Sequence, residues 1–375
     1  MEHTEGGNSI TLRQDDIEIL FKFSSPEEGG ENAQYAKGQL QGAAGYAYQN
    51  KTSLLEIKRN LFYHLRQCKS VVSVLFSFDS TGSRETKEKE KRAMSAILAV
   101  TEKLQGVITF GDSLTLQNGR GQVILDKAGK SELEYYMPAE LPLPEDWAKD
   151  APKESVERRN KSMRLLQEKH IYVTPWLPLL SERAEDVGRS VEEVCARAVA
   201  LLILSLYSEC RVGEHLSYEK AREFVAPILE SYGASGYFSP EEKKYLDNPD
   251  STEKEQIQFA WQYENLWVME WALGLTDDLF WPDRICDVPG SVQLMKKFPT
   301  MDALLAVAKL RPRKELLEQA DLIYRLHWAC VDARVMGMPA PQKVEAGVVM
   351  ERHHALFWLA GCDEMCSWDE VDLST

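Results

Sequence analysis

Three predicted helical segments, 257–271, 321–334 and 348–359, carry ionisable side chains among large aromatic residues. In each segment the polar and aromatic residues recur three, four or seven positions apart, so they share a helix face. The residues concerned are Glu264, Trp267 and Trp271; Asp321, Arg325, Trp328 and Asp332; Tyr324, His327 and Arg334; and Glu351, His354 and Trp358. A charge on such a face must be paired or must reach water, because an unpaired buried ion is very costly.

Two interpretations of these residues are open. If the three segments converge on a cleft, their carboxylates and imidazoles could perform general acid–base catalysis. If they pack closely, the same residues form hydrogen bonds between helices and fix the helix register. The candidate cluster consists of Glu264, Asp321, Tyr324, Arg325, His327, Asp332, Glu351 and His353, with His354 as the alternative to His353. We favour the structural interpretation, because buried ion-pair networks occur without any chemistry.

Arg325 is the residue of the cluster with the most specific expectation. It lies one helical turn after Asp321 and two turns before Asp332, so the spacing predicts a guanidinium held between two carboxylates. If that face packs against the segment 257–271, Glu264 becomes a third partner. A buried Arg325 would then be essential for stability.

Motifs for metals and cofactors are sparse in this chain. Glu351-x-x-His354 matches half of the ligand set of a di-iron helix bundle, but the chain has no second copy of that motif. The sequence also lacks His-Glu-x-x-His, Gly-x-Ser-x-Gly and the glycine-rich phosphate-binding motifs. Cys362 and Cys366 have no second Cys or His pair at zinc spacing, so we interpret them as ordinary thiols. The sequence predicts neither a metal nor a cofactor.

The charge balance restricts the class of partner. The 375 residues include 44 Lys+Arg and 59 Asp+Glu, a formal net charge of -15. Recognition of phosphate requires a basic surface, which argues against a nucleic acid or an anionic membrane as partner. We interpret the local basic cluster at 157–164 as a solvated or inter-domain helix face. The expected partner is a protein or a small polar ligand.

Cysteine usage and hydropathy indicate the compartment. The first residues lack the basic and then apolar pattern of a signal peptide. The longest apolar stretch, 198–207, is about half of the ~20 residues that span a bilayer, so it predicts a buried helix. The seven cysteines are scattered and odd in number, unlike a disulfide framework. These features predict a reduced, cytoplasmic protein.

Residues 1–137 alternate strand and helix patterns. Strands are predicted at 17–23, 71–78, 107–110, 114–116 and 123–125, and helices at 54–68 and 85–104. Residues 79–82 (Asp-Ser-Thr-Gly) predict a turn, and residues 118–121 (Asn-Gly-Arg-Gly) predict a hairpin. The order β-α-β-α-β-β-β is typical of a small α/β sandwich with an antiparallel edge.

A second, helical domain is predicted after a linker. Residues 138–154 contain four prolines, which hinder both helices and sheets, and we interpret them as the linker. Residues 155–375 form the helical domain, with helices near 155–169, 190–210, 217–232, 240–247, 253–273, 301–309, 312–336 and 347–360. Ser190, Ser239 and Thr252 each precede a glutamate by three residues, as in a capping box. The predicted fold class is therefore α+β.

Several motifs of the helical half occur together in one order. They include Arg158-Arg159-x-Lys161-Ser162-Met163, Gln258-Phe259-x-Trp261-x-Tyr263-Glu264, Ala320-Asp321-x-x-Tyr324-Arg325-x-His327-Trp328, Glu351-Arg352-His353 and Trp368-Asp369. With these motifs, residues 155–372 resemble the bacterial family called domain of unknown function 4272. The chain departs from the family pattern at His354, where Tyr is usual, and at Phe357, where Asn is usual. The resemblance implies a helical fold but no activity, substrate or cofactor.

The sequence favours a non-enzymatic binding or interaction protein in the cytoplasm. The alternative is a metal-independent hydrolase or transferase that uses Glu264, Glu351 and a histidine as acid and base groups. Solvent access distinguishes the two functions. A reachable cleft lined by these groups would favour the enzyme, and a network closed to water would favour the binding protein.

Overall fold

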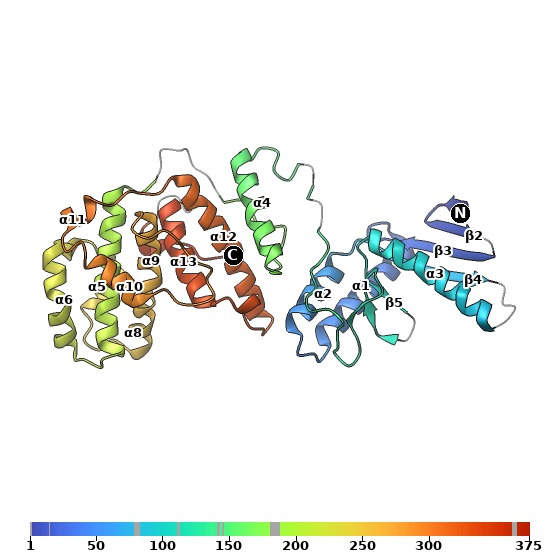
Figure 1. Ribbon diagram of the computed structural model, residues 1–375, viewed down its shortest axis with the longest axis horizontal. Coiled ribbons are helices and arrows are strands. Elements are labelled where there is room, and N and C mark those ends of the chain that lie inside the picture. Colours follow the sequence, from blue (N-terminus) through green and yellow to red (C-terminus); the bar gives the residue numbers. More distant parts are fainter. Residues whose placement is uncertain are drawn as a thin grey trace. The chain divides into compact units, whose positions relative to one another are not determined.

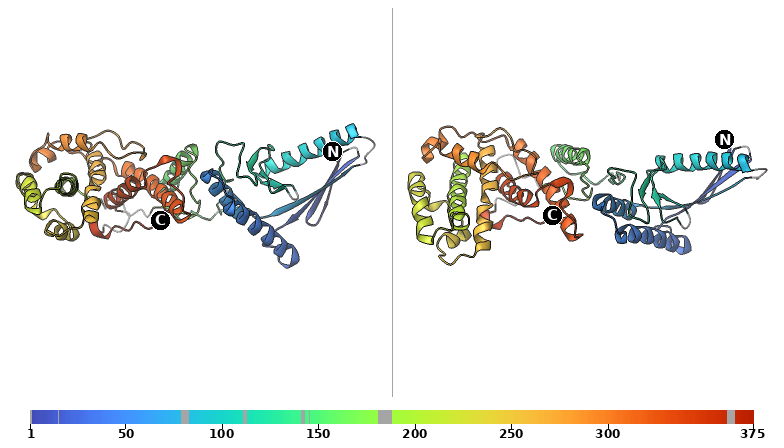
Figure 2. Two further views of the ribbon diagram at one scale, coloured as in Figure 1. Left: turned by 90° about the horizontal axis from the view of Figure 1, so that it is seen from below. Right: turned by 60° about the horizontal axis from the view of Figure 1, so that its bottom comes forward.

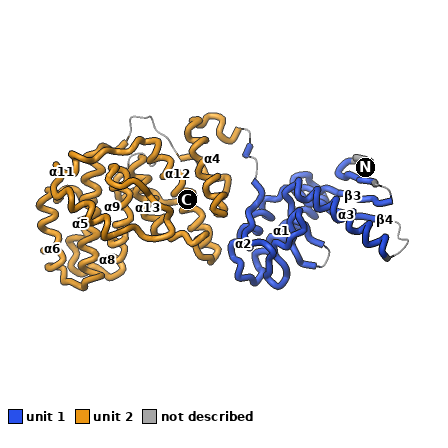
Figure 3. Tube along the Cα trace, viewed as in Figure 1, with its two compact units in different colours: residues 1–144 blue, residues 145–375 orange. Residues whose placement is uncertain are grey.

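The computed structural model describes residues 2–14, 16–78, 83–110, 113–140, 143–144, 146–180, 188–361 and 366–375. The turn predicted at 79–82 and the thiol of Cys362 lie outside these residues. The chain divides into two compact units, residues 1–144 and 145–375 (Figure 3). The first unit combines two sheets with helices, and the described part of the second is helical without strands. The α+β fold class is confirmed.

A four-stranded antiparallel sheet forms part of the N-terminal unit. Its strands are β1 (Glu2–Gly6), β2 (Ser9–Gln14), β3 (Ile17–Ser24) and β4 (Val71–Phe78), in that spatial order. Strand β3 alternates as predicted, with Ile17, Ile19 and Phe21 buried on one face. These side chains pack against the helix α3 (Ser83–Lys103), which runs along the sheet (Figure 2).

A smaller sheet and two helices complete this unit. The sheet consists of β5 (Ile108–Thr109), β6 (Leu116–Gln117) and β7 (Val123–Leu125), and the helices are α1 (Gly30–Gln49) and α2 (Leu55–Gln67). Strands β6 and β7 form the predicted hairpin, which is closed by a bond from the Gly121 amide to the Asn118 carbonyl at 2.9 Å. Leu61, Ile124 and Leu125 are fully buried where α2 meets this sheet.

The prediction missed three elements of the N-terminal unit: β1, β2 and α1. Strand β2 has polar residues at four of its six positions, and its register against β3 places Leu12 opposite Ile19. Helix α1 contains Gly38, Gly42 and Gly45, which disfavour helix, and its buried face consists of alanines. A stripe of alanines gives little contrast in hydrophobicity, so its periodicity does not predict a helix.

The C-terminal unit is built around helix α5 (Figure 1). Its helices are α4 (Lys153–Glu168), α5 (Val191–Val212), α6 (Tyr218–Tyr232), α7 (Pro240–Leu246), α8 (Glu253–Ala260), α9 (Gln262–Ala272), α10 (Val288–Met295), α11 (Met301–Leu305), α12 (Arg313–Val335) and α13 (Ala346–Ala360). Residues 198–204 of α5 are all buried, as expected for the longest apolar stretch. Helices α6, α8, α9 and α11 pack around it.

Most helix ends occur where local chemistry predicts them. Ser190, Ser239 and Thr252 each form a complete capping box with a glutamate three residues later. Gly361 ends α13 in the left-handed conformation, with φ of 63°. None of the described helices is both long and apolar enough to span a membrane.

One prediction about the helices of this unit was wrong, and one helix was missed. The helix expected over 253–273 is interrupted at Trp261, whose carbonyl accepts the Glu264 amide at 3.0 Å in a tighter turn. Helix α10 was not predicted, because its first residues, Val288-Pro-Gly, are typical of a turn. The structure caps this helix with the Asp287 side chain, which accepts the Gly290 amide at 3.1 Å.

Candidate functional site

Helices α9, α12 and α13 bring the predicted polar residues into one region of the C-terminal unit (Figure 1). Helix α13 packs against both of the other helices. All of the candidates except Asp332, which is half-buried, are buried, namely Glu264, Asp321, Tyr324, Arg325, His327, Glu351 and His353. We call these seven side chains, together with Asn265 and Arg352, the polar core. Four separate groups of contacts hold it together.

The first group is the ion pair between Arg325 and Asp321. Arg325 is 0% exposed and donates to both carboxylate oxygens of Asp321, from Nε at 2.9 Å and from Nη2 at 2.8 Å. Nη2 also lies 3.4 Å from the carbonyl oxygen of Pro178. The predicted pairing with Asp321 is therefore present, and it is bidentate, the strongest geometry for such a pair. Arg325 makes no bond to Asp332, so the expectation of a second carboxylate partner was wrong.

The second group joins α9 to α13 through Glu264 and Arg352. The Arg352 Nε donates to Glu264 at 3.2 Å, and its Nη1 donates to the Phe280 carbonyl at 2.6 Å. The second oxygen of Glu264 accepts the backbone amide of Cys286. The expectation that Glu264 pairs with Arg325 was wrong, because a different arginine on the neighbouring helix neutralises it. Burial lowers the pKa of Arg352, and the Glu264 carboxylate opposes that change.

Glu351 makes the third group of contacts, which also joins α9 to α13. Its carboxyl accepts the Asn265 amide at 2.6 Å, and the same amide group donates to Gln262 at 2.9 Å. Burial raises the pKa of Glu351 to about 7, although the bond from Asn265 acts in the opposite direction. Glu351 therefore has a pKa suited to proton transfer at neutral pH, but it is only 6% exposed.

His327 of α12 and His353 of α13 form a buried pair of imidazoles. Their Nδ1 atoms are 2.7 Å apart, and the rings meet edge to face. Phe357 packs against the ring of His353 with centroids 3.9 Å apart, and Tyr324 lies 5.8 Å away. Burial lowers the pKa of His353 to about 2 and that of His327 to about 4. Both rings are therefore neutral at pH 7, and one of them donates to the other.

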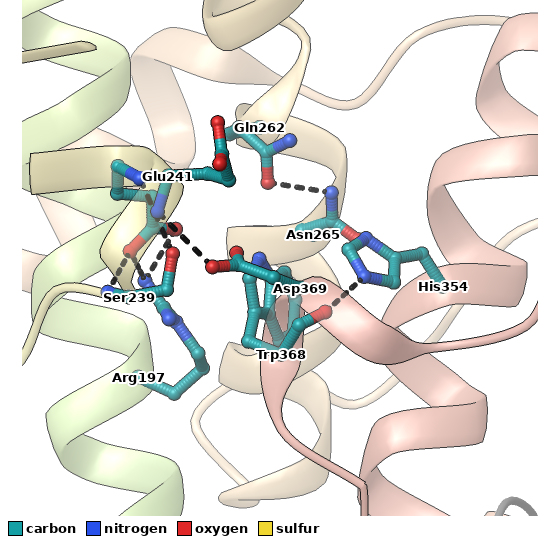
Figure 4. Close-up of polar contacts among 9 residues, drawn as sticks. Arg197, Ser239, Glu241, Gln262, Asn265, His354, Trp368 and Asp369 are labelled. Atoms are coloured by element: carbon teal, nitrogen blue, oxygen red, sulfur yellow. Dashed lines mark hydrogen bonds and ion pairs between the residues drawn. The ribbon is translucent and has the colours of Figure 1, made fainter. Parts of the chain in front are cut away.

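His354, the alternative imidazole, belongs to a different cluster near the end of the chain (Figure 4). The Nε2 of His354 lies 2.8 Å from the Trp368 carbonyl oxygen, and the guanidinium of Arg197 lies 4.6 Å from the centre of the Trp368 ring. Arg197 in turn forms a buried ion pair with Glu242 at 2.6 Å. Asp369 accepts the backbone amide of Glu241 at 3.1 Å. These contacts fasten Trp368 and Asp369 to α5, α7 and α13.

Sequence reasoning overlooked four buried residues of these networks: Asn265, Arg352, Arg197 and Glu270. The sequence could have indicated that Arg197 is buried and paired, because it is the one charged residue within the apolar stretch 194–204. Glu270 lies on α9 and accepts a bond from Ser291 at 2.8 Å, and burial raises its pKa to about 8. Nothing in the spacing along one helix distinguishes Glu270 from an exposed glutamate, so only the packing of α10 explains its burial.

The basic segment at the start of the C-terminal unit also differs from expectation. Arg158 and Arg159 of α4 are buried, so the prediction of a solvated face was wrong for both. Arg159 donates to the Pro175 carbonyl at 2.9 Å and stacks on Trp147 at 4.7 Å. Lys161 bonds to Glu318 of α12 at 2.6 Å. These contacts attach α4 to the rest of its unit.

Metal-binding side chains are not clustered in the part of the chain that the structure describes. No set of three or more His, Cys, Asp or Glu side chains among the described residues has the proximity that a metal ion requires. The half-motif Glu351-x-x-His354 is divided between two networks, because Glu351 contacts Asn265 whereas His354 contacts Trp368. The arrangement therefore supports hydrogen bonding between helices.

The fold and the site define a class of protein: an N-terminal α+β unit followed by a helical unit with a closed polar core. The chain belongs to the family described as Domain of unknown function (DUF4272), which it matches over residues 158–371. This range is more than half of the chain and contains all nine residues of the polar core. Comparisons with curated proteins and with solved structures gave no match.

Proposed function

We propose that the C-terminal unit is a non-enzymatic binding or interaction module, and that its polar core is a structural device that fixes three helices in register. One observation carries the proposal: Glu264, Glu351 and His353 are only 2%, 6% and 0% exposed. A catalytic acid or base must touch its substrate. These groups touch Arg352, Asn265 and His327 instead.

The partner that this module would bind is a protein or a small polar ligand, and the formal charge of -15 argues against nucleic acid and anionic lipid. A cytoplasmic location is supported by the thiols. Cys68, Cys195, Cys210 and Cys286 are thiols that form no disulfide bond. Free thiols are typical of a reducing compartment.

A metal-independent hydrolase or transferase is the second candidate function. It is favoured by Glu351, whose pKa of about 7 is suited to a general acid or base. This candidate requires the three helices to open, because substrate cannot otherwise reach the carboxyl. The two functions therefore differ in a measurable property, the solvent access of the core in the native protein.

Covalent labelling of the native full-length chain tests this property. Carbodiimide with glycine ethyl ester labels accessible carboxyls, and diethyl pyrocarbonate labels accessible imidazoles. We expect Glu264 and Glu351 to react more than about tenfold slower than the exposed Glu223, because their labelling requires local opening. His353 is expected to show the same protection relative to the exposed His215. Labelling of Glu351 and His353 at the rates of these controls would contradict the proposal and favour the enzyme.

A further inference from the structure

Strand β4 forms one edge of the four-stranded sheet. Among the described residues it pairs with β3, and no strand pairs with its other side. Its sequence, VVSVLFSF, contains no charged residue, no proline and no glycine. Exposed edge strands of soluble proteins usually carry charges, prolines or bulges that prevent pairing with another chain. The opposite edge strand, β1, is only five residues long and contains two glutamates.

The exposure of β4 increases toward its C-terminal half. The register with β3 places Val72, Val74 and Phe76 on the face that α3 covers, and Ser73 and Leu75 on the other face. Helix α1 reaches that second face at Ser73, whose hydroxyl lies 3.1 Å from the Tyr35 hydroxyl. Leu75 lies beyond this contact and is 67% exposed.

An occupant of this edge must be an extended strand with a free edge of its own. The occupant should also be an uncharged strand, because a charged residue opposite β4 would meet only apolar or hydroxyl side chains. Of the described strands with five or more residues, β4 itself is the one without charge. Two copies of this chain, each with a formal charge of -15, would therefore meet with less repulsion at β4 than at the other edge strand, β1, which contains two glutamates.

We propose that β4 is a self-association surface, through which two copies of the chain pair edge to edge in antiparallel orientation about a two-fold axis. The two four-stranded sheets then form one sheet of eight strands. With Leu75 on the axis, each Val74 lies opposite Phe76 of the second copy, and each Ser73 lies opposite Ser77. This register keeps apolar side chains together on the face that α3 covers. The proposal is independent of the function proposed for the C-terminal unit.

Light scattering after size-exclusion chromatography of the full-length chain tests this pairing. We expect the wild type to have twice the 42.7 kDa mass of one chain. The variant Leu75→Lys places two like charges opposite each other on the axis, and we expect its dissociation constant to rise more than about tenfold. The control Leu104→Lys changes an equally apolar, 57% exposed residue outside β4, and it should remain dimeric. A monomeric wild type would overturn the proposal, as would a Leu75→Lys variant that stays dimeric.

A cross-linking variant covers the case in which Leu75→Lys does not fold. Opposite residues of an antiparallel pair have Cβ atoms about 4.5–5.5 Å apart, close enough for a disulfide after small adjustments. We expect mild oxidation to join two Leu75→Cys chains through residue 75, as shown by peptide mapping. Wild type and Leu104→Cys treated in the same way should not form a comparable product. Failure of residue 75 to cross-link would also overturn the proposal.

Discussion

Arg325 is among the largest fully buried side chains of the described residues, so replacing it should have a large effect on stability. The variant Arg325→Met would leave the Asp321 carboxylate buried without its bidentate partner. We expect a loss of about 3–5 kcal/mol in the free energy of unfolding, the typical cost of breaking a buried pair. Urea denaturation of the wild type and the variant measures this difference.

A matched control exists on the surface of the same unit. Arg222 pairs with Asp247 at 3.0 Å, but the two side chains are 46% and 73% exposed. Arg222→Met should therefore cost at most about 1 kcal/mol. Equal losses for the two methionine variants would show that the Arg325 pair is solvated in solution.

Glu351 provides a second prediction, which concerns pH. Its pKa rises from 4.5 to about 7 on folding, so the native state favours the protonated carboxyl. The wild type should therefore lose stability as the pH rises from about 4.5 to about 7, because the unfolded chain releases its proton first. Glu351→Gln imitates the protonated form and removes this loss. Between pH 4.5 and pH 7, the free energy of unfolding of the variant should therefore increase by about 3 kcal/mol relative to that of the wild type.

Denaturation curves at several pH values between 4.5 and 7.5 test this difference. Glu223→Gln, an exposed glutamate of α6, is the control and should parallel the wild type. If Glu351→Gln also parallels the wild type, the Glu351 carboxyl is ionised in the native protein and the polar core is open to water.

The polar core also shows which residue contacts can be predicted from sequence. Asp321 and Arg325 are four positions apart on one helix, so their pairing follows from helix geometry. Glu264 and Arg352 are separated by 88 positions. The sequence alone therefore does not show whether Arg325 or Arg352 pairs with Glu264. The rotation of α9 against α13 decides between them, and that rotation depends on the packing of all the surrounding side chains.

At the scale of secondary-structure elements, the two histidines make the contact of α12 with α13 sensitive to acid. The pKa values of both rings lie below the ordinary 6.5 in the native state. The unfolded chain therefore binds protons at a higher pH than the native chain, and stability should fall as the pH drops below about 6.5. Each such histidine contributes a slope of about 1.4 kcal/mol per pH unit until its native pKa is reached.

His353→Gln keeps a polar partner for His327 and removes one of the two titrating groups. We expect the decrease in the free energy of unfolding between pH 6 and pH 5 to be smaller for this variant by about 1 kcal/mol. The control His215→Gln changes an exposed imidazole and should leave the slope unchanged. An unchanged slope for His353→Gln would show that His353 is protonated in the folded protein.

Prediction of the elements themselves succeeded where a local signal exists. The capping boxes at Ser190, Ser239 and Thr252 are short-range interactions, so the sequence contains them completely. Helix α1 lacks such a signal, because it begins at Gly30 without a side-chain cap and buries only alanines. Strand β2 pairs on both sides, with β1 and β3, and this pairing stabilises a segment whose own pattern is weak.

At the scale of the whole molecule, the hydrophobic cores indicate how far the two units depend on each other. The largest core cluster contains buried residues from Leu166 to Trp368, all of them in the C-terminal unit. The two smaller clusters lie between Leu12 and Tyr136, in the N-terminal unit. Each unit therefore buries its own core, as an independently folding domain does.

This separation predicts the outcome of limited proteolysis. We expect the first cuts within residues 138–152, where four prolines limit regular structure, and we expect the fragment 146–375 to keep its helical circular dichroism spectrum. The fragment includes Trp147, because its ring stacks on Arg159 and belongs to the C-terminal unit. A fragment beginning at residue 153 lacks that contact and should unfold at a lower urea concentration, since a cation–π contact is worth about 0.5–2 kcal/mol. An unfolded 146–375 fragment would mean that the C-terminal core requires the N-terminal unit, although no described core cluster is shared between them.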